Sequence, residues 1–273
     1  MSKKEGKLFN KVSAWLRKLN CREYLHYFGP KKFKFVQHAA ALLMKEALRC
    51  SFRRIEKILE MFGLKVPTYS ALCKSRKRIP PSLWNSFLSL SSGLKHEKVA
   101  IDGTGFSRTN PSFHFIKRID RKKPVKSYAK LSALLDVKKR KFCAIRVRTK
   151  PRHDVFDAKY LLARTRMKRL YADTAYDAEW LHEMCFEKNV QTFIKPRKNV
   201  RRGFYRRKQM KEYSEEEYHQ RSLIESGFGS LKRKYGGSVS GKGIVSVRSE
   251  LFCKAICHNL DLWSGRFSTE PLN

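Results

Sequence analysis

The sequence predicts an α/β fold in which helices flank a mixed sheet, preceded by a small all-helical region. Three observations support this: helical apolar spacing before residue 95, strand-like segments after it, and alternation of helices with strands from residue 157 onward. The chain has 273 residues, of which 41% are hydrophobic, so we expect a true core. We therefore assign a helical region to 1–95 and a mixed-sheet domain to 96–273.

The helical region contains two segments with apolar helical spacing and a shorter basic one. Residues 33–49 and 51–62 have this spacing, and Ser51 can cap the second helix. A break over 63–67 leads to a short helix over 68–78, which Thr68 can cap. Helix, glycine-containing turn and basic helix form the outline of a helix-turn-helix near 51–78, although any short helical hairpin has the same outline.

The sheet domain begins after a domain boundary near residue 95, which follows Pro80, Pro81 and a serine-rich segment. The predicted strands are 99–102, 130–137, 142–149, 169–173 and 191–194, and the predicted helices between them are 157–163 and 178–188. A polar turn joins 130–137 and 142–149 into a hairpin. Residues 195–211 carry nine cations and no acid, which predicts a basic linker, and the acidic residues 215–217 then begin a helix.

The charge of the chain favours a polyanionic partner. Sixty-one Lys and Arg against 24 Asp and Glu leave a net charge of +37, and cations are in excess in both parts of the chain. This distribution is typical of a protein that follows a nucleic-acid backbone along its length. A basic ribosome-like protein, or a surface adapted to salt or heat, would also account for the charge alone.

The cysteines and the apolar segments predict a cytoplasmic protein, associated with the nucleoid. Seven scattered cysteines indicate reduced thiols. Cys253, Cys257 and His258 could suggest zinc, but they lie in an apolar helical pattern, so we expect core packing. No apolar run approaches the ~18 residues of a membrane helix, and no secretory signal is recognisable.

Two aspartates stand at the ends of predicted strands. Asp102 ends the apolar strand KVAID before Gly103, and Asp173 ends RLYAD. Strand ends of this kind are where open α/β sheets place ligands and chemistry. Taken singly, each residue could also be an ordinary turn or helix-capping Asp.

A third block carries one carboxylate among cations. Tyr218, Arg221, Glu225 and Lys232 share one face at helical spacing, and that face is too polar for a core. A solvated salt-bridge stripe would explain the spacing. It would not explain two nearby glycines, 227 and 229, each of which costs a helix about 1 kcal/mol relative to Ala. Close approach of a phosphate backbone, or a helix break at 227, would explain them.

Together these blocks resemble the DDE transposases of prokaryotic insertion sequences. Tyr218, Arg221, Glu225 and Lys232 match the family signature of Tyr, two residues, Arg, three residues, Glu, six residues and Lys, while IDGTG and ADTAYD match its two Asp blocks. The resemblance covers roughly 51–265 and implies a ribonuclease-H-like fold. It departs from the pattern at Ser132, where many relatives have His.

The resemblance implies a catalytic triad of Asp102, Asp173 and Glu225 that binds two Mg²⁺ or Mn²⁺ ions per active site. By hypothesis, Asp102 bridges both ions while Asp173 and Glu225 each hold one. Tyr218, Arg221 and Lys232 are then candidates for contacts with DNA phosphates.

The implied reaction is cleavage at the ends of an insertion sequence and strand transfer into target DNA. The expected partners are double-stranded DNA, as terminal inverted repeats and target, and a second copy of the chain in a synaptic homodimer; no membrane and no nucleotide cofactor are expected. Two alternatives stay open: an inactive DNA-binding descendant of a transposase, and a metal-dependent nuclease without strand transfer.

The candidates for further DNA contacts lie in two basic segments. The first segment is the second helix of the helix-turn-helix, and the second segment is the basic linker. The candidates are Tyr69, Lys74, Arg76, Lys77, Arg201, Arg202, Arg206 and Arg207.

Overall fold

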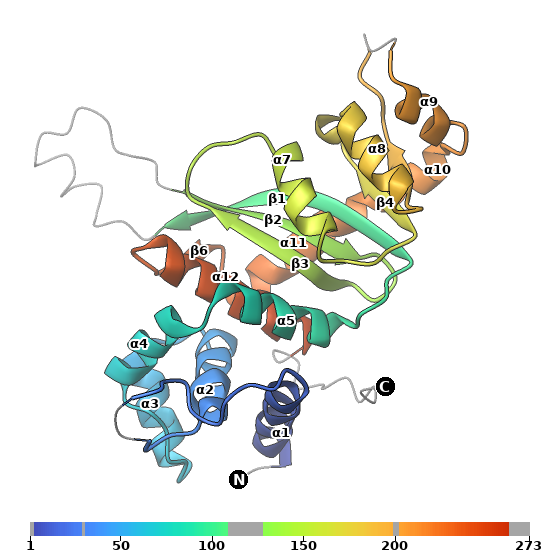
Figure 1. The fold of residues 1–273 in the computed structure, drawn as a ribbon. Coiled ribbons are helices and arrows are strands. Elements are labelled where there is room, and N and C mark those ends of the chain that lie inside the picture. The colour runs from blue at the N-terminus through green and yellow to red at the C-terminus, as the bar shows by residue number, and fades with distance from the viewer. Residues whose placement is uncertain (1–2, 29–30, 109–127, 199–201, 262–273) are drawn as a thin grey trace, which may run out of the picture. The chain divides into compact units, whose positions relative to one another are not determined.

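A computed structural model describes residues 3–28, 31–108, 128–198 and 202–261 (Figure 1). By its contacts the chain divides into two compact units, one of residues 1–91 with 248–273 and the other of residues 92–247. The first boundary lies close to the predicted one. The C-terminal segment differs from the prediction, because from Arg248 onward it groups with the N-terminal helices and not with the sheet.

The helical unit is built from six helices in the described residues. They are α1 Lys3–Lys18, α2 Phe35–Ala47, α3 Phe52–Met61, α4 Tyr69–Arg78, α5 Pro81–Ser92 and the larger part of α12 Ile244–Asn259. Both predicted caps are confirmed, since Ser51 accepts from the Arg54 amide at 3.2 Å and Thr68 from the Ala71 amide at 3.4 Å. Helix α5 was missed, because Pro80 and Pro81 were interpreted as a break although proline suits the first turn of a helix.

The apolar core shared by α2, α3 and α4 is small and well defined. Ile55 and Leu59 of α3 pack with Leu72 of α4 and Ala41 of α2, and all four are buried. Elsewhere in the unit, Trp15 lies 5.8 Å from Phe87 between ring centroids. The α3–α4 pair is therefore held against α2 by side chains at helical spacing.

The sheet unit contains one mixed sheet. Its strands are β1 Lys98–Arg108, β2 Tyr128–Asp136, β3 Lys141–Arg148, β4 Arg169–Ala172, β5 Gln191–Ile194 and β6 Ser238–Val239. The order is β3-β2-β1-β4-β5, with β6 paired to β1; β1, β2 and β3 are antiparallel neighbours, whereas β4 and β5 continue the sheet in parallel with β1. The predicted mixed sheet flanked by helices is confirmed, and only the short β6 was not anticipated.

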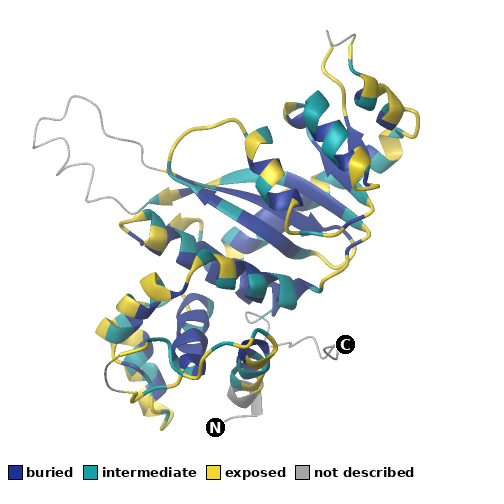
Figure 2. Cartoon of the chain, viewed as in Figure 1, coloured by how far each residue is buried: buried dark blue, intermediate teal, exposed yellow. Residues whose placement is uncertain are grey.

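Helices cover both faces of this sheet (Figure 1). On one face, Val99, Ile101 and Leu134 pack with residues of α7 Val155–Leu162 and α8 Glu179–Glu187. On the other face lies α11 Ser222–Tyr235, whose Phe228 stacks on Phe142 of β3 at 5.8 Å. Burial is concentrated in the strands and the helix sides that face them (Figure 2).

The glycines of α11 have different surroundings. A Cβ built on Gly227 would lie 3.1 Å from Cδ1 and 3.2 Å from Cδ2 of Leu135, whereas one on Gly229 meets nothing closer than Arg233 Nη1 at 3.6 Å. The helix runs unbroken through both positions. Gly227 therefore allows close packing of α11 on the sheet, and neither a helix break nor an approaching phosphate backbone is needed to explain it.

The predicted basic linker contains a docked helix. Residues Phe204–Met210 form α9, and Gln209 accepts from the Thr192 amide at 2.9 Å while donating to the Val190 carbonyl at 3.0 Å. The segment is thus attached to β5 and is not a free linker. The helix expected at the acidic cluster is confirmed as α10 Glu215–Tyr218, and a 3₁₀ turn over His219–Arg221 connects it to α11.

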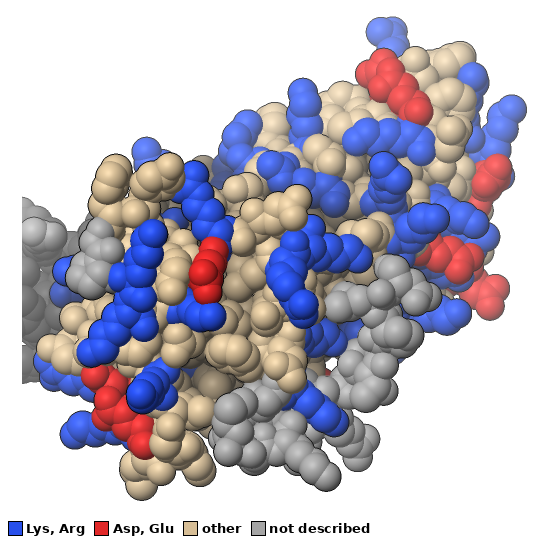
Figure 3. All heavy atoms as spheres, turned by 60° about the horizontal axis from the view of Figure 1, so that its bottom comes forward, with Lys and Arg blue, Asp and Glu red and all other residues tan. Residues whose placement is uncertain are grey.

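The surface carries many more basic than acidic side chains. Lys and Arg are spread over the whole face shown in Figure 3, while Asp and Glu form a few small groups. No helix in the described part of the chain is long and apolar enough to span a membrane.

Candidate active site

Three carboxylates predicted to act together come from three elements of the sheet unit. Asp102 lies within β1, Asp173 directly follows β4, and Glu225 lies in the first turns of α11. Asp102 was predicted to end its strand, but β1 continues to Arg108. In the parallel register Ala100 pairs with Tyr171, so Asp102 and Asp173, each two residues further along, lie level with each other. Ile101 and Ala172 face the core under α7 and α8, so strand alternation turns Asp102 and Asp173 toward the α11 face.

Arg221 lies among these carboxylates. Its Nη1 donates to Glu225 Oε1 at 2.8 Å, one helical turn apart. Although burial opposes the effect, the negative charges of Glu225 and Asp173, with Tyr218, raise the pKa of Arg221. The charges of two of the three acids therefore act on one guanidinium group.

The environment of Asp102 links the first and third acids. Burial raises its pKa, and the carboxylates of Glu225 and Asp154 raise it further, while the Gly103 amide and Arg221 act in the opposite direction. Like charges affect each other in this way when they are close. Asp102 therefore shares its surroundings with Glu225 on one side and with Asp154 on the other.

Both aspartates are oriented in the same manner. Asp102 Oδ1 accepts from the Gly103 amide at 2.7 Å, and Asp173 Oδ1 accepts from the Thr174 amide at 2.7 Å. Their second oxygens accept no hydrogen bond from the described residues. Each carboxylate thus has one oxygen fixed by the backbone and one available to a ligand.

Oxygen donors of this kind suit a hard divalent cation. Among the described residues, however, no group of three or more His, Cys, Asp or Glu is close enough together to hold a metal ion. Glu225 is paired with Arg221 instead. The donor chemistry and the free aspartate oxygens fit divalent ions, and the third ligand would have to leave its guanidinium partner.

The other residues of the third block differ in exposure. Tyr218 is 9% exposed and packs near Tyr213, with 6.0 Å between ring centroids, so its ring serves mainly in packing. Lys232 is half-buried, with its Nζ 5.4 Å from the Phe106 ring, and forms no ion pair with the described residues. Lys232 and Arg221 are therefore the cations of this block that a phosphate could reach.

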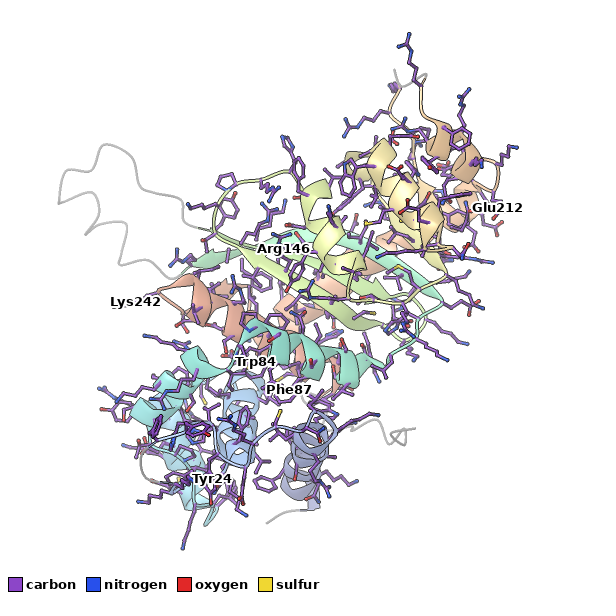
Figure 4. All side chains as sticks on the ribbon, in the orientation of Figure 1. Tyr24, Trp84, Phe87, Arg146, Glu212 and Lys242 are labelled. Carbon is purple, nitrogen blue, oxygen red and sulfur yellow. The ribbon has the colours of Figure 1, made fainter. Side chains whose placement is uncertain are left out.

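Ser132 belongs to a buried network of hydrogen bonds and ion pairs between the sheet and α7. Its Oγ donates to Asp157 Oδ2 at 2.6 Å, and Arg148 Nη2 pairs with the same oxygen at 2.7 Å. Arg146 reaches from β3 toward α7, with its Nε 3.3 Å from Asp157 Oδ1 (Figure 4). Ser132 and Asp157 are fully buried, so this position is occupied by a structural hydrogen bond.

The arginines predicted to bind DNA in 195–211 do not form one set. Arg206 is 9% exposed, and its Nε donates to Asp177 Oδ1 at 2.6 Å, so its predicted role in DNA contact is corrected to an internal ion pair. Arg202 and Arg207 are exposed. Arg201 lies outside the described residues.

Asp177 is the centre of this internal network. It is fully buried, and it accepts from His182 Nε2 at 3.1 Å, from Arg206 and from the Arg197 amide at 2.9 Å. Although burial acts in the opposite direction, these hydrogen bonds lower the pKa of Asp177 to about 2. The network ties the basic segment to the turn that follows Asp173.

In the helical unit, α4 presents three of its four predicted DNA contacts. Lys74 and Lys77 are exposed, and Tyr69 is 41% exposed with Arg53 5.1 Å from its ring. Arg76 is the exception. Its guanidinium lies 4.9 Å from the Phe52 ring and 3.8 Å from Glu250 Oε2, so it belongs to the interior of the unit and its prediction is corrected.

The seven cysteines are all free thiols. Cys253 and Cys257 are buried in α12, as expected for core packing.

Two residues outside the predicted triad lie close to the segments that follow Asp102 and Asp173. Asp154 has Oδ2 only 3.2 Å from where a Cβ on Gly103 would stand, and Arg197 lies beside the Thr174 and Ala175 carbonyls at 3.5 Å. The PRHD motif, residues 151–154, predicted that Asp154 lies near the site, and the structure agrees. For Arg197, the basic cluster concealed any individual signal.

The sheet and its acids define a ribonuclease-H-like protein. The sequence model of the family described as "Transposase DDE domain" matches residues 93–260. The chain therefore belongs to the DDE transposase family.

The solved structures that are similar to this chain include two transposase complexes. A piggyBac transposase synaptic complex with hairpin DNA is similar over 94% of this chain and 72% of that chain, at 11% identity and a TM-score of 0.47. A pre-cleavage Mos1 transpososome is similar over 93% of this chain and 87% of that chain, at 9% identity and a TM-score of 0.25. A search of curated proteins found no match.

Proposed function

We propose that this transposase cleaves DNA at the ends of an insertion sequence and joins those ends to target DNA by phosphoryl transfer. The observation that supports this most directly is that Asp102, Asp173 and Glu225, which come from three different elements, all interact electrostatically with Arg221, and that Glu225 forms an ion pair with it. Membership of the DDE family agrees with it.

Asp102, Asp173 and Glu225 would hold two Mg²⁺ or Mn²⁺ ions, which when bound activate an attacking oxygen and stabilise a leaving one at phosphorus. The backbone amides of Gly103 and Thr174 orient the two aspartates for this role. Arg221 and Lys232 lie on the same helical face as Glu225 and would neutralise the phosphate being cut. The same cations would bind the DNA before any ion arrives.

Double-stranded DNA is the proposed partner, both as element ends and as target. The net charge of +37 supports it. The similar piggyBac structure is a synaptic complex with DNA, and we propose a synaptic homodimer for this chain because two ends must be paired. The exposed side chains of α4, Tyr69, Lys74 and Lys77, are proposed to read the ends through a helix-turn-helix.

The test of this function is the substitution Glu225→Gln. We expect it to abolish Mg²⁺-dependent nicking of a labelled duplex that carries an element end, while the affinity for that duplex is kept. Glu216→Gln is the matched control, because Glu216 is an exposed glutamate of α10 and is expected to leave nicking unchanged. Retained nicking in Glu225→Gln would remove this residue from the mechanism.

The same assay separates transposition from simple nuclease activity. A transposase gives joined products in which the labelled end is covalently linked to target DNA, in addition to nicks. Nicks without joined products would support a nuclease, and DNA binding without either product would support an inactive DNA-binding descendant.

A further inference from the structure

A hollow of about 770 Å³ is lined by the residues that follow Asp102 in β1. We name it the β1 hollow; it is lined by residues 103–105 of β1, Tyr128 and Lys130 of β2, residues 151–154, Ala175 and Arg197. Gly103 connects the hollow to the candidate active site, since it lines the hollow and its amide donates to Asp102.

The charge in the β1 hollow is not neutralised by the protein. Its acid, Asp154, is paired with Lys130 and lies 3.7 Å from Arg148. Arg152 and Arg197 form no ion pair with any residue in the described part of the chain. Arg152 lies 4.5 Å from the Phe156 ring, and Arg197 lies 3.5 Å from two backbone carbonyls. Two guanidinium groups from different segments are therefore available to an anion.

The glycine at position 105 indicates that a ligand occupies the β1 hollow. A Cβ on Gly105 would meet no atom within 4 Å, and its backbone is not in the left-handed region, so neither packing nor conformation requires glycine there. Glycine inside a strand weakens that strand. Gly103 differs, because a Cβ there would come within 2.9 Å of Lys130 Cε. No contact within the described part of the protein explains why position 105 is a glycine. A ligand that needs this space would explain it.

We propose that the β1 hollow binds the phosphodiester backbone of the cleaved DNA strand, next to the phosphate at Asp102, with Arg152 and Arg197 as its phosphate ligands. This inference rests on the proposed function and extends it to the path of the strand. Guanidinium groups match phosphate oxygens in geometry and charge. The exposed Arg152 and Arg197 can contact a backbone that continues beyond the active site.

The test uses duplexes that carry one uncharged methylphosphonate at successive positions of the cleaved strand. The full chain is titrated with each duplex in EDTA, and affinity is measured by fluorescence anisotropy. For the wild-type chain we expect a loss of about tenfold at one or two positions next to the scissile phosphate. Arg152→Ala and Arg197→Ala should each lower the affinity for the fully charged duplex and remove the penalty at one of those positions.

Arg164→Ala is the matched control. Arg164 also lies over an aromatic ring near α7, 3.6 Å from the Tyr160 ring centroid, but it does not line the hollow. It should keep the full wild-type pattern of penalties. If Arg152→Ala and Arg197→Ala keep that pattern as well, no phosphate is bound in the hollow.

Gly105→Val gives an independent measurement. We expect its thermal unfolding temperature to equal or exceed that of the wild-type chain, because valine favours a strand, while its affinity for the charged duplex falls. Wild-type affinity in a folded Gly105→Val chain would overturn the proposal.

The outcomes separate this inference from the proposed function. A wild-type chain that nicks and joins DNA without any methylphosphonate penalty beside the scissile phosphate would refute the hollow alone. A chain that shows the penalty but neither nicks nor joins DNA would refute the proposed function and leave the hollow as a DNA site.

Discussion

Gly227 and Gly229 stand two residues apart in α11, yet different forces act on them. Gly227 is buried, and the absence of a side chain allows the helix to pack close to Leu135. A side chain on Gly229, in contrast, would fit without a close contact to the described residues. Helix propensity alone would disfavour both equally. The packing partner, which lies more than ninety residues earlier in the chain, decides the role of Gly227.

A pair of alanine substitutions checks this difference. Gly227→Ala should lower the free energy of unfolding by about 1–3 kcal/mol, because the added methyl group overpacks against Leu135. Gly229→Ala should raise it by up to about 1 kcal/mol, through helix propensity. Urea denaturation of both variants measures the two effects, and a stabilised Gly227→Ala would contradict the packing argument.

At the scale of elements, α9 shows how a basic segment is fixed in place. Arg206 enters the protein to pair with Asp177, and Gln209 bonds to the backbone of β5. The fixed arrangement positions Arg197 through the hydrogen bond from its amide to Asp177.

Protonation of Asp177 at low pH should weaken the interactions that hold this segment in place. Asp177 has a pKa lowered to about 2 in the folded protein, below the ordinary 3.8, so its contribution to stability is complete above pH 4 and is lost as the pH falls toward 2. That contribution is about 2 kcal/mol. The unfolding free energies of wild-type and Asp177→Asn chains, measured in urea, should differ by a constant amount above pH 4 and converge below it.

A second prediction at this scale concerns α4. Lys74→Ala combined with Lys77→Ala should reduce discrimination between an element end and random duplex, because both side chains are exposed on the proposed recognition helix. Competition binding measures the ratio of the two affinities. Arg233→Ala is the control, since Arg233 is an exposed cation of α11. An unchanged ratio in the double variant would contradict the helix-turn-helix role.

Most elements could be predicted because local patterns determine them. Alternation and apolar spacing located β1 to β5 and α2 to α4, and the caps Ser51 and Thr68 were read from residue type. The three acidic blocks were recognisable through spacing within the family signature. The partners of Arg76 and Arg206 could not be predicted, because Glu250 and Asp177 lie far away in sequence. The sequence around a charged residue also does not reveal whether its side chain is buried.

At the scale of the molecule, Lys and Arg side chains are distributed over the whole face shown in Figure 3. With a net charge of +37, binding to DNA should release many counterions. We expect affinity for a random duplex to fall by about a thousandfold or more between roughly 50 and 200 mM salt. Anisotropy titrations across this range measure the slope, and a change below about tenfold would show that few phosphates are contacted.

The division of the chain has a consequence for how the protein is made. The helical unit takes its residues from both ends of the chain, and the sheet unit is inserted between them. Cys257 donates to the Leu43 carbonyl at 3.3 Å, and Asn259 donates to Ser91 at 2.8 Å. On the ribosome, the sheet unit can therefore fold first, whereas the helical unit stays incomplete until α12 has emerged. A chain that lacks the residues from Arg248 onward contains the whole sheet unit but only part of the helical unit.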